Sequence, residues 1–369
     1  MAEIVLNNLA HSYLPNPESE QEFALRELTH RWKQGGAYAL LGPSGCGKST
    51  LLNIISGLLQ PSQGQVLFDG NEVNELSPKE RNIAQVFQFP VVYGGMTVFD
   101  NLAFPLRNIK APKAQIKQKV QEVAELMELT DVLKKKANNL SADQKQKISM
   151  ARGLVREDVS AILFDEPLTV IDPHLKWKLR RKLKQIHEQL NITMLYVTHD
   201  QLEAATFADE IAVMYQGKIV QFGTPQSLFE KPNHTFVGYF IGSPGMNFIP
   251  VSWEQGECRF GNQTVTLTEQ QEAALNATPS TNLKIGIRPE FVQLATSQER
   301  IEHSLQAECI HIEDYGTYSL ATLMLDEHKI IMRVEEGERI AIGHVSIHFP
   351  NESLKLYIDE YLAGEVVSE

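Results

Sequence analysis

The residues with the clearest chemical potential form a glycine-rich segment that ends in a lysine and a serine. Its members are Gly42, Pro43, Ser44, Gly45, Cys46, Gly47, Lys48 and Ser49, with Thr50 directly after them. Glycines at this spacing let backbone N–H groups approach phosphate closely, and a helix that follows them adds a positive field. Lys48 is placed to reach the β- and γ-phosphates of a nucleoside triphosphate, and Ser49 to bind Mg²⁺.

The segments on either side decide between a phosphate site and an ordinary glycine-rich turn. Residues 37–41 are an apolar run that predicts a short buried strand. Residues 48–59 are rich in apolar side chains and predict a helix that ends near Leu58. The glycine-rich segment therefore lies between a strand and a helix, which is the setting that a phosphate-binding loop requires.

A second apolar run, over residues 160–164, predicts another central parallel strand and ends in Asp165 and Glu166. Ligands of open α/β sheets gather at the carboxyl ends of the strands, so Asp165 is placed to hold Mg²⁺ through water. Glu166 is placed to polarise an attacking water molecule. The alternative interpretation is an ordinary acidic strand end.

A third apolar run, over residues 193–198, ends in His199 and Asp200 and precedes a predicted helix over 201–208. His199 is placed to hydrogen-bond the γ-phosphate. A lone histidine after a strand is usually structural, but three strands that each end in groups suited to phosphate chemistry favour the functional interpretation.

Composition limits the remaining functions. The chain has 369 residues, 43% of them hydrophobic, which is enough to form the cores of two domains. Its formal net charge of -12 argues against coating nucleic acid. Three widely spaced cysteines suit a reducing compartment, and no apolar stretch approaches the about 18 residues of a spanning helix. We therefore expect a cytosolic chain whose role at a membrane, if it has one, is peripheral.

Two regions with different periodicity surround these strands. Between the first two predicted strands, helical spacing of apolar residues predicts a helical subdomain, and its markers are Ile116, Val120, Val123 and Met127. After about Gly242 the pattern changes to short β-rich pieces such as residues 284–288 and 330–334, which predict a small β-barrel.

With these elements in order, the chain resembles the nucleotide-binding subunits of ABC transporters over about residues 4–248. The resemblance implies an α/β fold: a P-loop NTPase (RecA-like) core over residues 1–240, with a helical subdomain at about 89–155. It further implies an all-β, OB-like regulatory or dimerisation domain over residues 241–369. The expected cofactors are ATP and Mg²⁺.

The resemblance assigns roles to three further residues. Gln88 matches the glutamine of the Q-loop, which links Mg²⁺ and the attacking water to the membrane subunit. Tyr13 lies where the family places an aromatic residue that stacks on adenine, and the alternative is a buried structural tyrosine. Asp172 resembles the aspartate of the D-loop, which crosses to the partner subunit.

The signature motif departs from the family pattern. The family has Leu-Ser-Gly-Gly-Gln, and this chain has Leu-Ser-Ala-Asp-Gln, with the positions Ser141, Ala142, Asp143 and Gln144 facing the partner's nucleotide. Read locally, Ser141 and Gln144 form a capping box at the start of a helix. Asp143 places a negative charge where a γ-phosphate should bind, and at about 5 Å and an effective dielectric near 20 the repulsion is roughly 3 kcal/mol. We therefore expect a heterodimer with a second ATPase that has an intact signature.

The resemblance also indicates the direction of transport. Residues 235–248 resemble the linking segment of carbohydrate-importer ATPases, and residues 164–177 resemble the subset that takes up glycerol. This implies an ATP-hydrolysing importer subunit for a small polyol or sugar-type solute, with glycerol or glycerol phosphate favoured. The implied partners are transmembrane permease subunits and an extracytoplasmic solute-binding protein. The implied location is the cytoplasmic side of the inner membrane.

Three alternatives stand beside this interpretation. A soluble ABC ATPase of DNA repair or translation is disfavoured because such proteins tend to have coiled-coil inserts or paired cassettes. A non-hydrolysing regulatory subunit would explain Asp143, but intact Lys48 and Glu166 argue against it. Oligonucleotide binding by the barrel is disfavoured because the tail is rich in glutamate, as in residues 335–338, and has no basic stripe.

Overall fold

The computed structural model describes residues 2–156, 158–261, 263–278, 280–295 and 304–364. The chain divides into two compact units, Met1–Pro225 and Gln226–Glu369, and each is described by itself. The sequence predicts a domain boundary between residues 240 and 241, and that boundary stays a prediction. The contacts assign residues 226–240 to the second unit, where the hydroxyl of Tyr357 donates to the carbonyl of Pro232 at 2.9 Å.

A six-stranded sheet forms the centre of the first unit, in the order β10-β9-β3-β8-β7-β6. Its strands are β3 (Ala37–Leu41), β6 (Ile83–Val86), β7 (Ala161–Asp165), β8 (Met194–Thr198), β9 (Glu210–Tyr215) and β10 (Lys218–Gly223). All neighbours pair in parallel except β10 and β9. Leu41 pairs with Thr198 and Asp165 with Val197, so the carboxyl ends of β3, β7 and β8 meet at one edge. The three strands predicted from apolar runs are confirmed.

A second, antiparallel sheet in the same unit has the order β2-β1-β4-β5. Its strands are β1 (Ile4–His11), β2 (Leu25–Trp32), β4 (Gln63–Phe68) and β5 (Asn71–Glu72). Helix α1 (Lys48–Ser56) packs between the two sheets, because its buried Leu51 and Ile55 share one core cluster with Ile4 and Leu163. The helix ends at Gly57, whose φ of 84° is the left-handed conformation that favours glycine.

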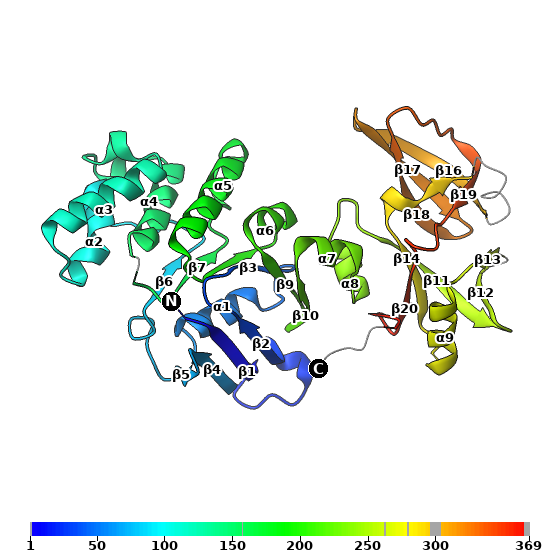
Figure 1. Ribbon diagram of the computed structural model, residues 1–369, viewed down its shortest axis with the longest axis horizontal. Helices are drawn as coiled ribbons and strands as arrows, with labels where there is room; N and C mark the ends of the chain where they lie inside the picture. The colour runs from blue at the N-terminus through cyan, green and yellow to red at the C-terminus, as the bar shows by residue number, and fades with distance from the viewer. Residues whose placement is uncertain (1, 157, 262, 279, 296–303, 365–369) are drawn as a thin grey trace. The chain divides into compact units, whose positions relative to one another are not determined.

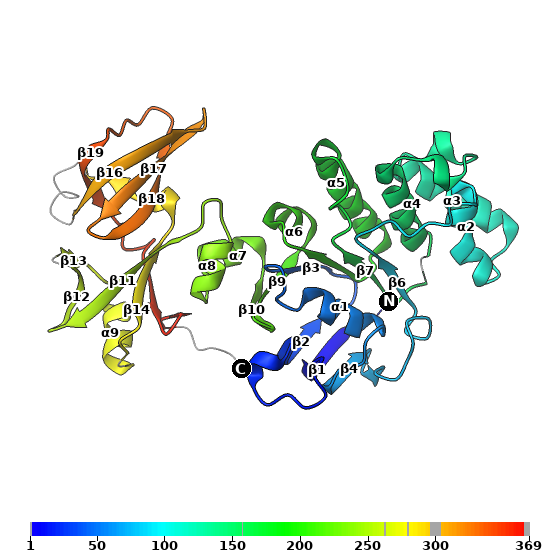
Figure 2. The same cartoon turned by 180° about the vertical axis from the view of Figure 1, so that it is seen from behind.

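The other face of the parallel sheet is covered by α5 (Pro173–Leu190) and α6 (Gln201–Phe207), on the side opposite α1 (Figure 1). The view from behind shows the same layering (Figure 2). Helices α2 (Val98–Asn108), α3 (Lys113–Leu126) and α4 (Ala142–Leu154) gather at the β6 end of the sheet. The four residues that predicted this helical group are all buried: Ile116, Val120, Val123 and Met127.

The second unit contains two antiparallel sheets, in the orders β13-β12-β11-β14-β20-β21 and β15-β19-β16-β17-β18. The strands of the first are β11 (Asn247–Glu254), β12 (Glu257–Phe260), β13 (Gln263–Val265), β14 (Leu283–Ile287), β20 (Lys355–Ile358) and β21 (Tyr361–Leu362). Those of the second are β15 (Gln293–Leu294), β16 (Leu305–Asp314), β17 (Tyr318–Leu325), β18 (His328–Glu335) and β19 (Gly343–His348). One buried cluster draws residues from both sheets, including Ile285 and Leu323.

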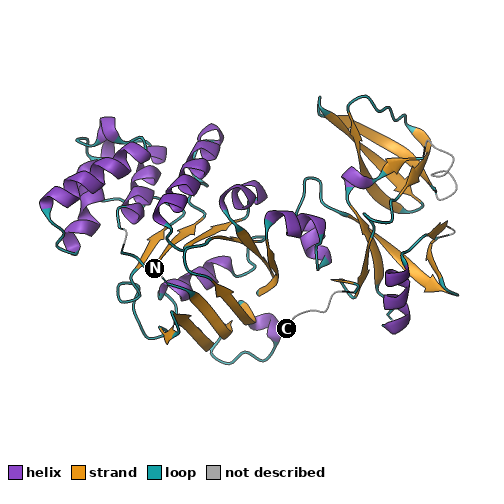
Figure 3. Cartoon of the chain, viewed as in Figure 1, coloured by secondary structure: helices purple, strands orange, loops and turns teal. Residues whose placement is uncertain are grey.

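Helices also occur in this β-rich unit, and the last of them lies inside residues 241–369, the region predicted to be all-β. They are α7 (Pro225–Glu230), α8 (Thr235–Phe240) and α9 (Glu269–Ala277), and Figure 3 shows α9 among the strands. Thr268 and Gln271 form a capping box at the start of α9, a local signal that was present in the sequence. Across the described residues, no helix combines the length and apolar content that crossing a bilayer requires.

Candidate active site

The glycine-rich loop joins β3 to α1, and its backbone conformation depends on glycine. Gly45 and Gly47 have φ values of +81° and +101°, in the left-handed region. A Cβ on Gly47 would lie 2.6 Å from the carbonyl oxygen of Ala24, and a Cβ on Gly42 would lie 2.4 Å from that of Met214. Larger residues at these positions would therefore displace the loop from its close packing.

Lys48 lies at the start of α1 and folds back over the loop. Its side chain is buried, and Nζ donates to the carbonyl oxygens of Gly42 at 2.9 Å and Pro43 at 2.8 Å. Nζ also lies 3.9 Å from Sγ of Cys46. The ammonium group is thus held beside the backbone of the loop, which is the position that a phosphate-binding lysine needs.

Ser49 and Asp165 bring two oxygen ligands together across the sheet edge. Oγ of Ser49 donates to Oδ1 of Asp165 at 3.3 Å. Burial raises the pKa of Asp165 above its ordinary value of 3.8; the hydrogen bond from Ser49 opposes this shift and the nearby charge of Glu166 adds to it. A hydroxyl and a carboxylate are hard oxygen donors, which fits a site for Mg²⁺.

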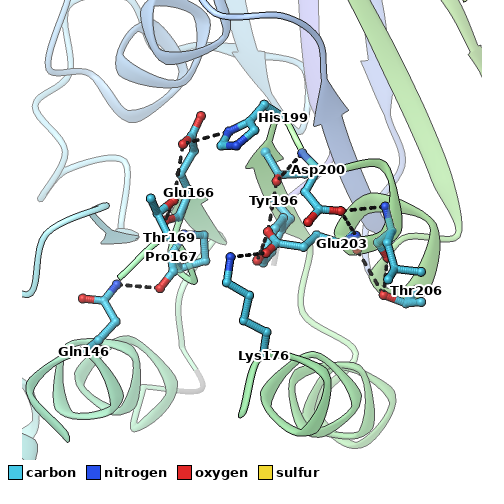
Figure 4. Close-up of polar contacts among 12 residues, drawn as sticks. Gln146, Glu166, Pro167, Thr169, Lys176, Tyr196, His199, Asp200, Glu203 and Thr206 are labelled. Atoms are coloured by element: carbon cyan, nitrogen blue, oxygen red, sulfur yellow. Dashed lines mark hydrogen bonds and ion pairs between the residues drawn. The ribbon is translucent and has the colours of Figure 1, made fainter. Parts of the chain in front are cut away.

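Glu166 and His199 approach each other from the ends of adjacent strands (Figure 4). Nδ1 of His199 lies 3.2 Å from Oε2 of Glu166. The backbone of Glu166 has a φ of +46°, which costs free energy for a residue with a side chain. Its N–H donates to the carbonyl of Val197 at 3.0 Å and its carbonyl accepts from the hydroxyl of Thr169 at 3.1 Å. These bonds hold the strained residue in place.

Gln88 follows β6 and is half-buried. The segment that contains Gln88 is connected to the segment that contains Glu166 by a residue that the sequence analysis does not predict. Gln146 of α4 is completely buried, and its Nε2 donates to the carbonyls of Phe87 at 3.0 Å and Pro167 at 2.8 Å. Figure 4 shows the bond to Pro167. The flanking segments of Gln88 and Glu166 are therefore held by one side chain.

Tyr13 is exposed over 66% of its surface, so the alternative of a buried structural tyrosine is wrong. Its hydroxyl lies within hydrogen-bond distance, 3.1 Å, of the hydroxyl of Thr50 in α1. Its ring packs edge-on against His11, with ring centroids 4.7 Å apart. The exposed ring is thereby attached to the helix that follows the phosphate loop.

The signature segment forms the predicted helix start. Oγ of Ser141 accepts from the N–H of Gln144 at 3.2 Å, and the N–H of Ser141 donates to Oε1 of Gln144 at 3.3 Å, so the capping box is confirmed. Asp143 is not an isolated charge, because Nζ of the largely buried Lys147 lies 3.9 Å from its Oδ2 and 3.7 Å from Oε2 of Glu128. The repulsion estimated from the sequence therefore omits a compensating cation.

Asp172 caps α5 by accepting from the N–H of His174 at 2.9 Å. Within the parts of the chain that the structure describes, no hydrogen bond or ion pair joins Asp172 or Asp143 to the phosphate loop. The structure thus gathers Ser49 with Asp165, and Glu166 with His199. Asp143 and Asp172, two of the five predicted partner-facing residues, lie outside that cluster.

Comparisons with known proteins agree with this geometry. Residues 25–169 match the ABC transporter family, and residues 242–292 match the MalK OB fold domain. The chain is 43% identical to the trehalose import ATP-binding protein SugC of Mycobacterium tuberculosis, over 97% of this chain and 96% of the relative. It is 37% identical to the trehalose/maltose import ATP-binding protein MalK of Thermococcus litoralis, over 93% of this chain and 95% of the relative.

Two further matches extend the comparison. The sn-glycerol-3-phosphate import ATP-binding protein UgpC of Bordetella avium is 37% identical over 90% of this chain and 89% of its own length. The solved structure of cbiO1 from Clostridium perfringens, part of the ABC transporter complex cbiONQ, is 28% identical with a TM-score of 0.56, over 62% of this chain and 90% of that one. The fold is thus a P-loop ATPase core with a C-terminal OB domain. The chain therefore belongs to the ATP-binding subunits of ABC-type sugar importers, ATPases that work peripherally at the cytoplasmic face of a membrane.

Proposed function

We propose that this chain binds ATP with Mg²⁺ at the loop between β3 and α1, and that hydrolysis there energises import through permease subunits. The strongest support is that two side-chain contacts lie at one sheet edge, the contact of Ser49 with Asp165 and that of Glu166 with His199. The first pair suits a hard cation, and the second suits activation of water next to a phosphate.

In the proposed mechanism, the loop N–H groups and Nζ of Lys48 hold the β- and γ-phosphates, and Ser49 and Asp165 hold Mg²⁺. Bound there, Mg²⁺ would supply positive charge that offsets the negative charge of the phosphates. Glu166 accepts a proton from water as the water oxygen attacks the γ-phosphorus. The bond from γ-phosphorus to the β–γ bridging oxygen then breaks, and ADP and phosphate leave.

The remaining predicted residues support this step. His199 holds the carboxylate of Glu166 through the 3.2 Å contact and bonds the γ-phosphate. Gln88 links Mg²⁺ and the attacking water to the permease. Tyr13 stacks on adenine, a contact that contributes about 1–3 kcal/mol by analogy with base stacking. Asp172 and residues 141–144 act toward a second ATPase subunit.

The relatives support a small sugar-type or polyol solute, carried by permeases and delivered by a solute-binding protein. The names of these relatives include the solutes trehalose, maltose and sn-glycerol-3-phosphate. The preference for glycerol stays a prediction. It is tested by reconstituting the assembly and measuring ATP turnover with trehalose, maltose, glycerol and glycerol-3-phosphate in parallel.

The comparisons do not support the predicted pairing with a second, distinct ATPase. Lys147 compensates Asp143, which removes part of the physical reason for that pairing. We therefore infer that two copies of this chain pair around two nucleotides. Sedimentation of the purified chain with Glu166→Gln and MgATP should give a dimer, whereas a persistent monomer that dimerises only with another ATPase would restore the heterodimer.

The central test is calorimetry of MgATP binding together with phosphate release. Lys48→Ala should abolish both, because the buried ammonium group is lost from the loop. Lys33→Ala is the matched control, since it removes an exposed lysine just before β3 and should change neither. Binding without turnover in the wild-type chain would instead favour the non-hydrolysing alternative.

A further inference from the structure

A buried carboxylate joins three elements behind His199. The side chain of Glu203, in α6, is 5% exposed. Its Oε2 accepts from the hydroxyls of Tyr196 at 3.1 Å and Thr198 at 3.0 Å, and its Oε1 accepts from Nζ of Lys176, in α5, at 3.4 Å (Figure 4). The carboxylate belongs to α6, and its hydrogen-bond donors come from β8 and α5. A buried charged group is stable only when it has such partners.

The hydrogen bond between Thr198 and Glu203 has a fixed direction, because a carboxylate can only accept and the single hydroxyl hydrogen of Thr198 must be donated to it. The N–H of Asp200 donates to Oγ1 of Thr198 at 3.0 Å, so that oxygen is an acceptor for the backbone and a donor to Glu203. His199 is the residue between these two. The carboxylate of Asp200 in turn accepts from the N–H of Glu203 at 3.0 Å, which closes the turn from its other side.

The imidazole of His199 is 55% exposed, so its surroundings do little to fix its direction. Its position against Glu166 depends on the turn that carries it, and the turn is closed through Thr198 and Glu203. We propose that Glu203 is a positioning residue: through Thr198 it holds His199 against Glu166, while Lys176 compensates its charge and ties the turn to α5. The inference rests on the proposed roles of His199 and Glu166.

The test compares two threonines at opposite ends of β8: Thr193 directly precedes the strand, and Thr198 is its last residue. Thr198→Val removes the hydroxyl that links Asp200 to Glu203. Thr193→Val is the matched control, because Thr193 is also buried and its hydroxyl also accepts from a backbone N–H, that of Gly35 at 2.9 Å, and donates to a carbonyl, that of Ala2 at 2.9 Å. Thr193 lies at the opposite end of β8 from His199. Both variants should lower the melting temperature of the full-length chain.

Only Thr198→Val should lower kcat, by about tenfold or more, since small misplacements of a reacting group can cost up to about a hundredfold. Its KM for ATP should stay within about twofold, because the phosphate loop is untouched. Thr198→Ser keeps the hydroxyl and should restore most of the rate. Equal kcat values for the variants at positions 193 and 198, or a serine variant as slow as the valine one, would overturn the proposal.

A measurement that does not depend on ATP turnover, the imidazole resonance of His199, separates this inference from the proposed function. In chain labelled at histidine, with the His199 signal assigned by His199→Asn, the imidazole resonance should move in Thr198→Val and Glu203→Gln and stay in Thr193→Val. If Thr198→Val does not fold, Glu203→Gln by itself tests the positioning role. An unmoved resonance in both variants would refute the positioning role, even if wild-type turnover is high. A moved resonance in a chain without turnover would leave the positioning role standing and remove the proposed function.

Discussion

Nδ1 of His199 lies 3.2 Å from Oε2 of Glu166, although the two residues follow different strands. The parallel register of β7 and β8 creates this contact, because it places Asp165 opposite Val197 and so carries both strand ends to one edge. A histidine that holds a strained glutamate at the carboxyl edge of a sheet suits the activation of water beside a bound phosphate.

Glu166→Gln should lower kcat by about a hundredfold or more, since general-base catalysis contributes about 10²–10⁴-fold. Affinity for MgATP should be retained, because the amide keeps the size of the side chain and the phosphate loop is unchanged. Phosphate release and calorimetry measure the two quantities. Glu188→Gln, at an exposed position of α5, is the control and should turn over at the wild-type rate. Wild-type turnover in Glu166→Gln would exclude it as the base.

Lys147→Met should lower ATP turnover, because it leaves Asp143 without its compensating cation at the face offered to a partner's nucleotide. Asp143→Gly in the same chain should cancel that loss. In chemical denaturation the double-mutant cycle should give a coupling of roughly 0.5–1 kcal/mol, the range for partly exposed ion pairs. Lys145→Met is the control for charge alone. Additive effects of the changes at positions 143 and 147 would show that the pair is not coupled.

Restoring Ala142 and Asp143 to glycine should raise turnover further, since both the added Cβ and the anion are removed from the helix start. The comparison is made in the otherwise wild-type chain, with ATP titrated to saturation. Ala142→Gly alone separates the steric part from the charge. An unchanged rate in the double variant would mean that the altered signature costs this chain nothing.

Cys46 should react slowly with thiol reagents, because its side chain is only 5% exposed and burial raises its pKa, an effect that Lys48 partly opposes. Below that pKa the rate should rise about tenfold per pH unit, following the thiolate fraction. A bulky adduct inside the loop should block ATP, and bound ATP should slow the reaction. Mass spectrometry follows the adduct, with Cys46→Ala as control. A fully alkylated chain that still binds ATP would contradict the assignment of this loop.

Asp165→Asn should stabilise the nucleotide-free first unit at neutral pH while abolishing the Mg²⁺ dependence of ATP binding. Burial raises the pKa of Asp165 from 3.8, so the folded state favours the protonated form. The bound proton stabilises the folded state below pH 3.8, and this stabilisation is lost as the pH rises through the raised pKa of the folded state. The melting temperature of Asp165→Asn relative to wild type should therefore increase over that window and then stay level. Melting curves in chelator test this, with the exposed Asp131→Asn as control.

Much of the site follows from local patterns. The apolar runs of β3, β7 and β8 are strands that the sheet buries on both faces, so hydrophobicity alone located them. The glycine spacing before Lys48 and the capping box of Ser141 and Gln144 are also local, since each depends on residues close in the chain. The ion pair of Asp143 with Lys147 is local as well, because the two residues lie four positions apart in one helix, but the sequence analysis does not predict it.

What the sequence determined by itself is the chemistry that short spacing encodes: a phosphate loop, acidic and histidine strand ends, and capped helices. Which of these groups meet depends on how the strands and helices pack against one another. Gln146 and Glu203 belong to none of these motifs, and their roles come from backbone and hydroxyl partners such as Phe87, Pro167 and Tyr196. The physical reason is that a buried polar group must find partners, and sheet register and helix packing, which act across the whole chain, choose them.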